Sequence, residues 1–328
     1  MGSERGEDIG NAIAVDRDGN LYVTGKTEPQ GQDTDFPLVN PFQAHCGVGD
    51  TFGDCGDDAF ITKLDPTLEN MLYSTYFGGS YNGSEISAGD DVGTGIAVGA
   101  DGSIYVTGYT FATDFPVANA MQATKRGADN FPDAFVARLN PTNNTLLFST
   151  YVGGDEWDEG HALELDDNGN VTIGGMTNAR NFPILNASQS TLGNGICNLG
   201  GTERYCYDGF VTQLSTDGIL RLSTYIGGGL DDNLLALGLD GDNNLIGGGG
   251  SESPNFPVSG TAYQANKALQ RDGFWFRLGR ADEPTTPTAT VSPTLSVSPT
   301  PVTGPTATPT ATPTPPGDER VLLPMVHR

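Results

Sequence analysis

The sequence predicts an all-β fold, a β-propeller of about four four-stranded antiparallel blades of which the last is incomplete. The first observation is a stretch that recurs with a period of about 75 residues, at Met71–Gly79, Leu146–Gly154 and Leu220–Gly228. A fixed period of this size indicates a repeat architecture. The second is that further motifs recur in step with it. The third is a turn-rich composition, with 46 Gly, 21 Pro and only 17% charged residues, which is typical of all-β chains.

The first half of each repeat predicts a hairpin. Versions of IAVDRDGNLYVTG occupy Ile13–Gly25, Ile96–Gly108, Leu163–Gly175 and, in degraded form, Leu237–Gly249. The flanks are β-branched and aromatic, while the central Asp, Gly and Asn supply turn chemistry.

The second half of each repeat predicts another hairpin. In the first repeat AFITKL and MLYSTYF alternate apolar and polar residues on either side of a turn at Asp65-Pro66. One repeat therefore holds four antiparallel strands, the pattern of a propeller blade that buries its faces against its neighbours.

The motifs divide the chain into three parts. Residues 1–280 form the propeller domain, with repeats at about 6–80, 81–154, 155–228 and 229–280. The last repeat lacks the STY strand, which leaves fifteen strands. Residues 281–318 are a linker rich in Pro and Thr, which we expect to be disordered and extended. Residues 319–328 are a short apolar segment, interpreted as an attachment signal, as a strand that docks onto the open blade, or as a frayed tail.

The charge of the chain limits its partners. The formal net charge is −25 and the isoelectric point is near 4.1. Such a surface repels phosphate backbones and anionic lipid heads, so we expect neither nucleic acid nor a membrane surface as partner. Cations are favoured. No apolar run reaches the length of a membrane span.

The four cysteines predict two local disulfides, Cys46–Cys55 and Cys197–Cys206. Both pairs lie in the same insertion of their repeats, and the other repeats lack them. Metal binding is disfavoured because no CxxC spacing occurs. Disulfides indicate an oxidising compartment, so we expect an extracellular or cell-surface location. No signal peptide is visible, and we expect either that a leader has been removed or that the chain is a fragment of a longer array.

The motifs DGNLYVTG, DFP, DAFVARL and LLFSTYVGG, which recur in this order over about residues 6–280, resemble the bacterial β-propeller repeat family called SBBP. The resemblance implies a seven-bladed ring in large secreted or surface-attached proteins, whereas this chain holds about four repeats. It implies no catalytic residues.

An acidic side chain recurs where the chain enters the first strand of each repeat. Aligned on the IAVD motif, Asp8, Asp91, Asp158 and Asp232 share one position, which in a propeller lies at one mouth of the central channel. Gathered carboxylates repel one another unless cations or hydrogen-bond donors compensate. One interpretation is a site for Ca²⁺ or a cationic ligand. The other is that each Asp accepts backbone N–H bonds at its own blade junction.

Two further residues belong to the same region. Trp157 lies within an acidic connection, where an exposed ring would suit a sugar or a cation and a buried ring would be structural. His161 takes the strand position of Asn11 and Thr94. This favours a polar residue facing the channel mouth over a general base.

No catalytic motif is recognisable in the sequence. We therefore expect a secreted or surface-displayed scaffold for binding or adhesion, with a glycan or protein ligand and no required cofactor. The C-terminal stalk is a candidate for cell-envelope attachment. The alternative is a carbohydrate-active hydrolase or lyase with acidic catalysis at the channel mouth, which would need one asymmetric carboxylate pair with a raised pKa.

Overall fold

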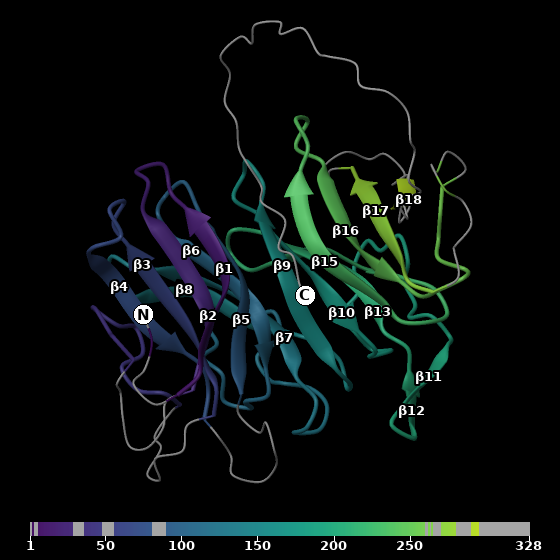
Figure 1. Ribbon diagram of the computed structural model, residues 1–328, viewed down its shortest axis with the longest axis horizontal. Helices are drawn as coiled ribbons and strands as arrows, with labels where there is room; N and C mark the ends of the chain where they lie inside the picture. The colour runs from purple at the N-terminus through teal and green to yellow at the C-terminus, as the bar shows by residue number, and fades with distance from the viewer. Residues whose placement is uncertain are drawn as a thin grey trace, which may run out of the picture. The chain divides into compact units, whose positions relative to one another are not determined.

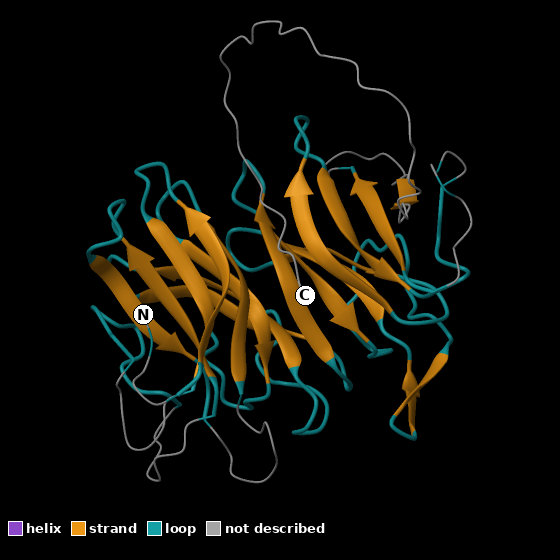
Figure 2. Ribbon diagram, in the orientation of Figure 1, coloured by secondary structure: helices purple, strands orange, loops and turns teal. Residues whose placement is uncertain are grey.

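In the computed structural model, the described residues are 2, 6–28, 36–47, 56–80, 90–259, 262, 264, 270–279 and 290–294. They form strands, turns and loops (Figure 2). None of them belongs to a helix long and apolar enough to cross a membrane. The all-β class predicted from the sequence is confirmed.

The strands form four antiparallel sheets of four strands each (Figure 1). The first sheet holds β1 (Asp8–Val15), β2 (Leu21–Thr27), β3 (Asp58–Leu64) and β4 (Met71–Phe77). The second holds β5 (Asp91–Val98), β6 (Ile104–Thr110), β7 (Asp133–Asn140) and β8 (Thr145–Val152). The third holds β9 (Asp158–Leu165), β10 (Val171–Thr177), β13 (Asp208–Leu214) and β14 (Leu220–Ile226). The fourth holds β15 (Asp232–Leu239), β16 (Leu245–Ser251), β17 (Asp272–Leu278) and β18 (Thr290–Thr294).

The first hairpin of the chain closes as its turn residues predict. The Asp16 carboxylate accepts the backbone N–H groups of Asp18 and Asn20 at 3.0 and 2.9 Å, and Gly19 has a φ of 83° that favours glycine. Burial alone would raise the pKa of Asp16. The hydrogen bonds from Asn20 and Tyr22 outweigh it and lower the pKa to about 2. The carboxylate thus stabilises the turn in its charged form.

The sheets pack face to face, with their first strands β1, β5, β9 and β15 side by side in that order (Figure 1). A hydrophobic core fills each of the three junctions. The Phe of the DFP motif or its NFP variant packs into these cores in three repeats, as Phe115, Phe182 and Phe256. In the first repeat Phe36 packs in a separate cluster. The rings of Phe115 and Phe135 have centroids 4.5 Å apart, and Phe182 and Phe210 repeat the contact at 4.7 Å. Within the described residues, no contact of comparable extent joins β15 back to β1, so the four sheets form an open series of blades.

The fourth blade differs from the sequence-based expectation. No STY motif is present to supply its outer strand, and the sequence therefore predicts three strands. Instead Thr290–Thr294 pairs antiparallel with β17 and completes the sheet. This segment falls within the part assigned to the disordered linker. An exposed edge strand binds an added strand through backbone hydrogen bonds, which place few requirements on the side chains of that strand. Alternation of apolar residues therefore predicts such a strand poorly. The other linker residues and residues 319–328 lie outside the described residues.

The predicted disulfide between Cys197 and Cys206 is present. It closes an insertion that forms a hairpin of its own, β11 (Ile196–Leu199) and β12 (Thr202–Tyr205). The sequence does not predict these two strands. For the other predicted pair, Cys55 lies outside the described residues.

Candidate functional site

Acidic side chains mark the same end of every sheet. In the second sheet Asp91 of β5 and Asp133 of β7 both pair with Thr110 of β6, which lies between them. The other three sheets repeat the row as Asp8–Thr27–Asp58, Asp158–Thr177–Asp208 and Asp232–Ser251–Asp272. Each blade therefore carries two carboxylates at one end of its strands, and the sequence predicted a role only for the one on the first strand.

The junction between blades brings acidic residues together in pairs. The backbone N–H of Asp232 donates to the carbonyl of Tyr207 at 2.7 Å, which sets Asp232 beside Asp208 of the preceding blade. The same backbone bond pairs Asp91 with Asp58 and Asp158 with Asp133. All six of these side chains are buried. Three of the four predicted residues, Asp91, Asp158 and Asp232, thus lie in junctions, each beside the Asp that begins the third strand of the preceding blade. The fourth, the half-buried Asp8, begins the first blade.

The Gly-Gly turn after each STY strand binds the junction carboxylate that belongs to the first strand of the following blade. The backbone N–H groups of Gly79, Gly154 and Gly228 donate to Oδ2 of Asp91, Asp158 and Asp232 at 2.7, 2.6 and 2.6 Å. A methyl group on the preceding Gly78 would collide with the carboxylates of Asp58 and Asp91. The two glycines therefore let the backbone approach two buried acids closely.

A glutamine binds the other junction carboxylate, which belongs to the third strand of the preceding blade. Gln122 donates from Nε2 to Asp133 Oδ2 at 2.7 Å and accepts the backbone N–H of Gly153 at 3.2 Å. Gln189 makes the equivalent bonds to Asp208 and Gly227, at 2.8 and 3.0 Å. This Gln was not among the predicted site residues, although it recurs six residues after the Pro of Phe-Pro in the first three repeats.

Burial dominates the electrostatics of these pairs. It raises the pKa of Asp133 and of Asp208 to about 7. For Asp158, burial and then the nearby Asp133 hold the pKa well above its usual range. Asp58 and Asp91 are raised in the same way, Asp58 by burial and then by Asp91. Two buried carboxylates that lie side by side do not both stay charged without compensation.

Trp157 and His161 lie together on β9 and its entrance. One carboxylate, that of Glu159, accepts Trp157 Nε1 at 2.6 Å and contacts His161 Nε2 at 2.9 Å. The half-buried Trp157 ring meets Phe111 edge-on, with centroids 5.7 Å apart. His161 Nδ1 lies 3.1 Å from the carbonyl of Leu234 in the next inner strand. Glu159 was not predicted as their common partner.

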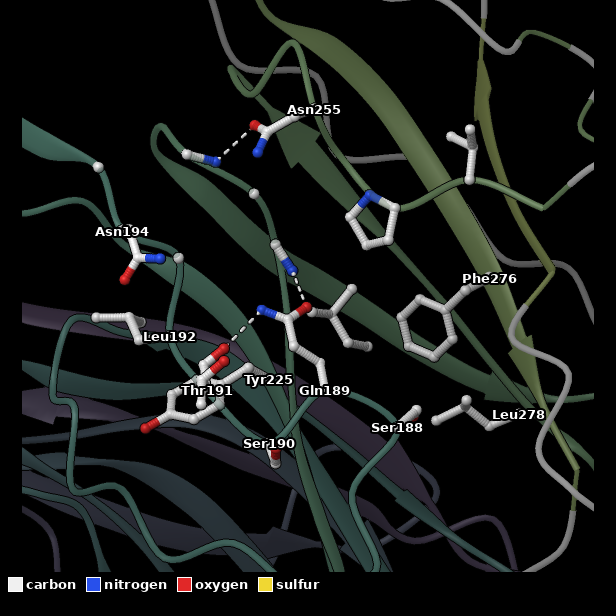
Figure 3. A pocket seen from close by; sticks show the side chains of 18 residues that line it. Ser188, Gln189, Ser190, Thr191, Leu192, Asn194, Tyr225, Asn255, Phe276 and Leu278 are labelled. Carbon is white, nitrogen blue, oxygen red and sulfur yellow. Dashed lines mark hydrogen bonds between the residues drawn. The ribbon is translucent and has the colours of Figure 1, made fainter.

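A cavity of about 810 Å³ opens between the third and fourth blades. Figure 3 shows Phe276 and Leu278 of the fourth blade across it from Leu192 and Asn194 of the third. Its other lining residues are Ser188, Gln189, Ser190, Thr191, Gly193, Gly195, Tyr225, Ile226, Gly227, Gly228, Gly229, Asn255, Pro257 and Val258. The volume and the mixture of apolar and polar groups are those of a small-molecule site.

The chain has the architecture of a β-propeller repeat protein. Its four-stranded antiparallel sheets stack face to face with their inner strands side by side, and each junction holds one hydrogen-bonded acidic pair. The sequence carries the matching signature. A family model described as the SBBP beta-propeller repeat matches residues 2–28, which confirms the resemblance at the first repeat.

No curated protein matches the chain. Among solved structures it is similar to a protein of unknown function from Bacteroides caccae, at 8% identity and a TM-score of 0.34, covering 82% of this chain and 61% of that one. A protein of unknown function from Dyadobacter fermentans matches at 12% identity and a TM-score of 0.42, and the match covers 87% of this chain and 64% of that one. A gluconolactonase from Xanthomonas campestris matches at 14% identity and a TM-score of 0.24, and the match covers 73% of this chain and 68% of that one. The chain spans less than two thirds of the length of the first two.

Proposed function

We propose that the protein is an extracellular binding scaffold that holds a neutral polar ligand of the saccharide class between its third and fourth blades. The observation that carries the proposal is the cavity at that junction. The other two junctions have the same framework of Asp, Gln and Gly-Gly, and a comparison of the three explains the cavity.

The residue before the recurring Gln decides whether the junction is filled. In the first blade it is Phe42, which packs against Phe77 with ring centroids 6.2 Å apart. In the second it is Met121, which packs against the next core. In the third it is Ser188, which is exposed. The equivalent residues of the outer strands are Phe77, Val152 and Ile226, and the small Val152 belongs to a filled core, so the residue before the Gln makes the difference. A plug of apolar side chain is thus replaced by open space.

The wall chemistry suits a polyol. Asn194 and the Nδ2 of Asn255 bond to no described residue, and the hydroxyls of Ser188 and Ser190 are exposed. The ring of Phe276 lines the opposite wall (Figure 3). Amides and hydroxyls can donate to and accept from sugar hydroxyls. The Phe276 ring is 0% exposed, so it contributes apolar wall and no open face for stacking.

Binding is favoured over the hydrolase or lyase alternative by the acidic residues themselves. Their pairs recur in equivalent form at three junctions, and the six carboxylates are buried. Acid catalysis at a glycosidic bond needs a distinguished pair within reach of the substrate. The disulfide Cys197–Cys206 supports the proposed oxidising location.

The test is a matched pair of variants at one position. Ser188→Phe restores the plug of the first blade, and Ser188→Ala leaves the cavity open. We expect glycan-array and titration experiments to show binding by wild type and by Ser188→Ala, with at least about a tenfold loss in Ser188→Phe. Undiminished binding by a folded Ser188→Phe would remove the cavity from the proposal. Glycan turnover would instead establish the catalytic alternative.

A further inference from the structure

The acidic pair at the third junction carries more negative charge than its surroundings balance. Asp208 and Asp232 are 0% and 1% exposed. Their Oδ2 atoms are fully used. Asp208 Oδ2 accepts Gln189 and the backbone of Gly193 at 2.8 and 2.9 Å, and Asp232 Oδ2 accepts Gly228 and Ser253 at 2.6 and 2.7 Å.

The other two oxygens of this pair point to a missing partner. The Oδ1 atoms of Asp208 and Asp232 are both buried, and neither accepts a hydrogen bond from any described residue. A buried carboxylate oxygen without a donor is costly, and buried polar atoms are almost always satisfied. The Oδ1 atoms of Asp133 and Asp158 at the second junction are buried and without a donor in the same way, so each of these two junctions has a pair of carboxylate oxygens whose charge needs compensation.

The second junction shows how the same arrangement acquires a positive charge from the chain. Three residues after the recurring Gln, that junction has Lys125, whose half-buried ammonium is attracted by both Asp133 and Asp158. Its Nζ also donates to the carbonyl of Ala128 at 2.8 Å. The ammonium therefore contributes positive charge near the pair at this junction.

At the third junction the corresponding residue is Leu192, which is buried in the core. Arg204 lies close in sequence to Asp208, but it forms a two-pronged ion pair with Asp231, at 3.0 and 2.9 Å, and stacks on Tyr207. The pair is thus left without the compensation that Lys125 gives its neighbour.

We propose that the third inter-blade junction binds one divalent cation of the calcium type between Asp208 and Asp232. The carboxylate oxygens of this pair are hard ligands that suit Ca²⁺, and water would supply the remaining coordination. The ion ties the first strand of the fourth blade to the third strand of the third blade. It is a structural site that adjoins the saccharide cavity, because Gln189, Gly193 and Gly228 bond to the pair and also line the cavity. The proposal stands whether or not that cavity binds a ligand.

The experiment measures Ca²⁺ itself on the full chain. After EDTA treatment and dialysis, equilibrium dialysis with ⁴⁵Ca²⁺ counts bound ions, and thermal denaturation with EDTA or with excess Ca²⁺ reports stability. We expect the wild type to bind Ca²⁺, with Tm raised by about 5–10 °C at a hundredfold excess over Kd.

Two variants separate this site from other acidic surfaces. Leu192→Lys places an ammonium where the second junction has Lys125, and Asp208→Asn removes one ligand. We expect each to bind one Ca²⁺ fewer than the wild type and to lose the corresponding rise in Tm. The exposed Asp129→Asn should behave as wild type.

Coincident wild-type melts in EDTA and Ca²⁺ would overturn the proposal, and so would an unchanged ion count in Leu192→Lys. If Asp208→Asn does not fold, the ion count of Leu192→Lys still decides.

Discussion

Asp133 shows how a single buried carboxyl links the stability of the fold to pH. Its side chain is 0% exposed, with Asp158 across the junction and Lys125 and the backbone of Arg126 on the covering loop. Burial raises its pKa to about 7, although the loop N–H and Lys125 oppose the change. The unfolded chain releases this proton near the ordinary Asp value of about 4. Between these two values the folded state therefore holds a proton that the unfolded state has lost.

This difference fixes the sign of the pH dependence. In metal-free solution the contribution of Asp133 to the free energy of unfolding is fully present below about pH 4 and falls as pH rises to about 7, by up to about 1.4 kcal/mol per pH unit. We expect Asp133→Asn, which mimics the protonated form, to flatten the fall. Urea denaturation in EDTA at several pH values measures it, with Asp129→Asn as the exposed control. A wild-type slope in Asp133→Asn would contradict the assignment.

For individual residues, the sequence predicts the positions of the recurring site residues better than it predicts their contacts. The recurrence of Asp8, Asp91, Asp158 and Asp232 in one register is visible from the motifs alone. Their partners come from the preceding repeat, and no local pattern joins Asp91 to Asp58 across the blade junction. Gln122 and its equivalents were open to detection by their fixed spacing, but a polar loop residue gives no sign of being buried.

The β-bulge of each inner strand requires a glycine in the strand beside it. Each inner strand contains a β-bulge, and the extra residue reaches the next blade: Asn11 donates to the carbonyl of Gly93 at 2.9 Å and Thr94 to that of Gly160 at 2.6 Å. The bulge also pushes the carbonyl of Val92 against Gly108 of β6, so that a Cβ there would collide with it. The Gly that ends each YVTG motif is therefore required by the strand beside it.

A pair of glycine substitutions tests this requirement. We expect Gly108→Ala to lower the free energy of unfolding by at least about 2 kcal/mol, because the methyl group meets backbone that is fixed by the sheet. Gly238→Ala, in β15, meets nothing within 4 Å and should be neutral or slightly stabilising. Chemical denaturation compares the two, and equal effects would show that the bulge accommodates a side chain.

The elements themselves are predictable where periodicity is strong. Alternating β-branched and aromatic residues predict the strands of the first three blades and three of the fourth. The strands that were missed, β11, β12 and β18, are four or five residues long. They depend on a disulfide or on an open sheet edge, which are tertiary features that a short window of sequence does not contain.

Across the whole series of blades, one repeat position has different surroundings according to its place. Ile96 in the second blade is 7% exposed and packs in the core of the first junction. Ile13, at the same position in the first blade, is 68% exposed. At the other end Trp275 is 41% exposed where Val136 and Val211 are buried. Each terminal blade thus presents a face of the kind that is buried inside the series.

Matched truncations of the two isoleucines measure what a neighbouring blade contributes. We expect Ile96→Ala to cost about 2–5 kcal/mol of unfolding free energy, because it opens a cavity between two sheets. Ile13→Ala should cost less than about 0.5 kcal/mol, because its side chain already contacts solvent. Denaturant titration of the dilute protein gives both values. A large cost at Ile13 would mean that the face of the first blade is covered in solution, by a second copy of the chain or by another part of the same one, and sedimentation across a concentration series would separate these two cases. Since the blade faces are built from one repeated pattern, the cost at Ile13 reports directly whether the series stays open.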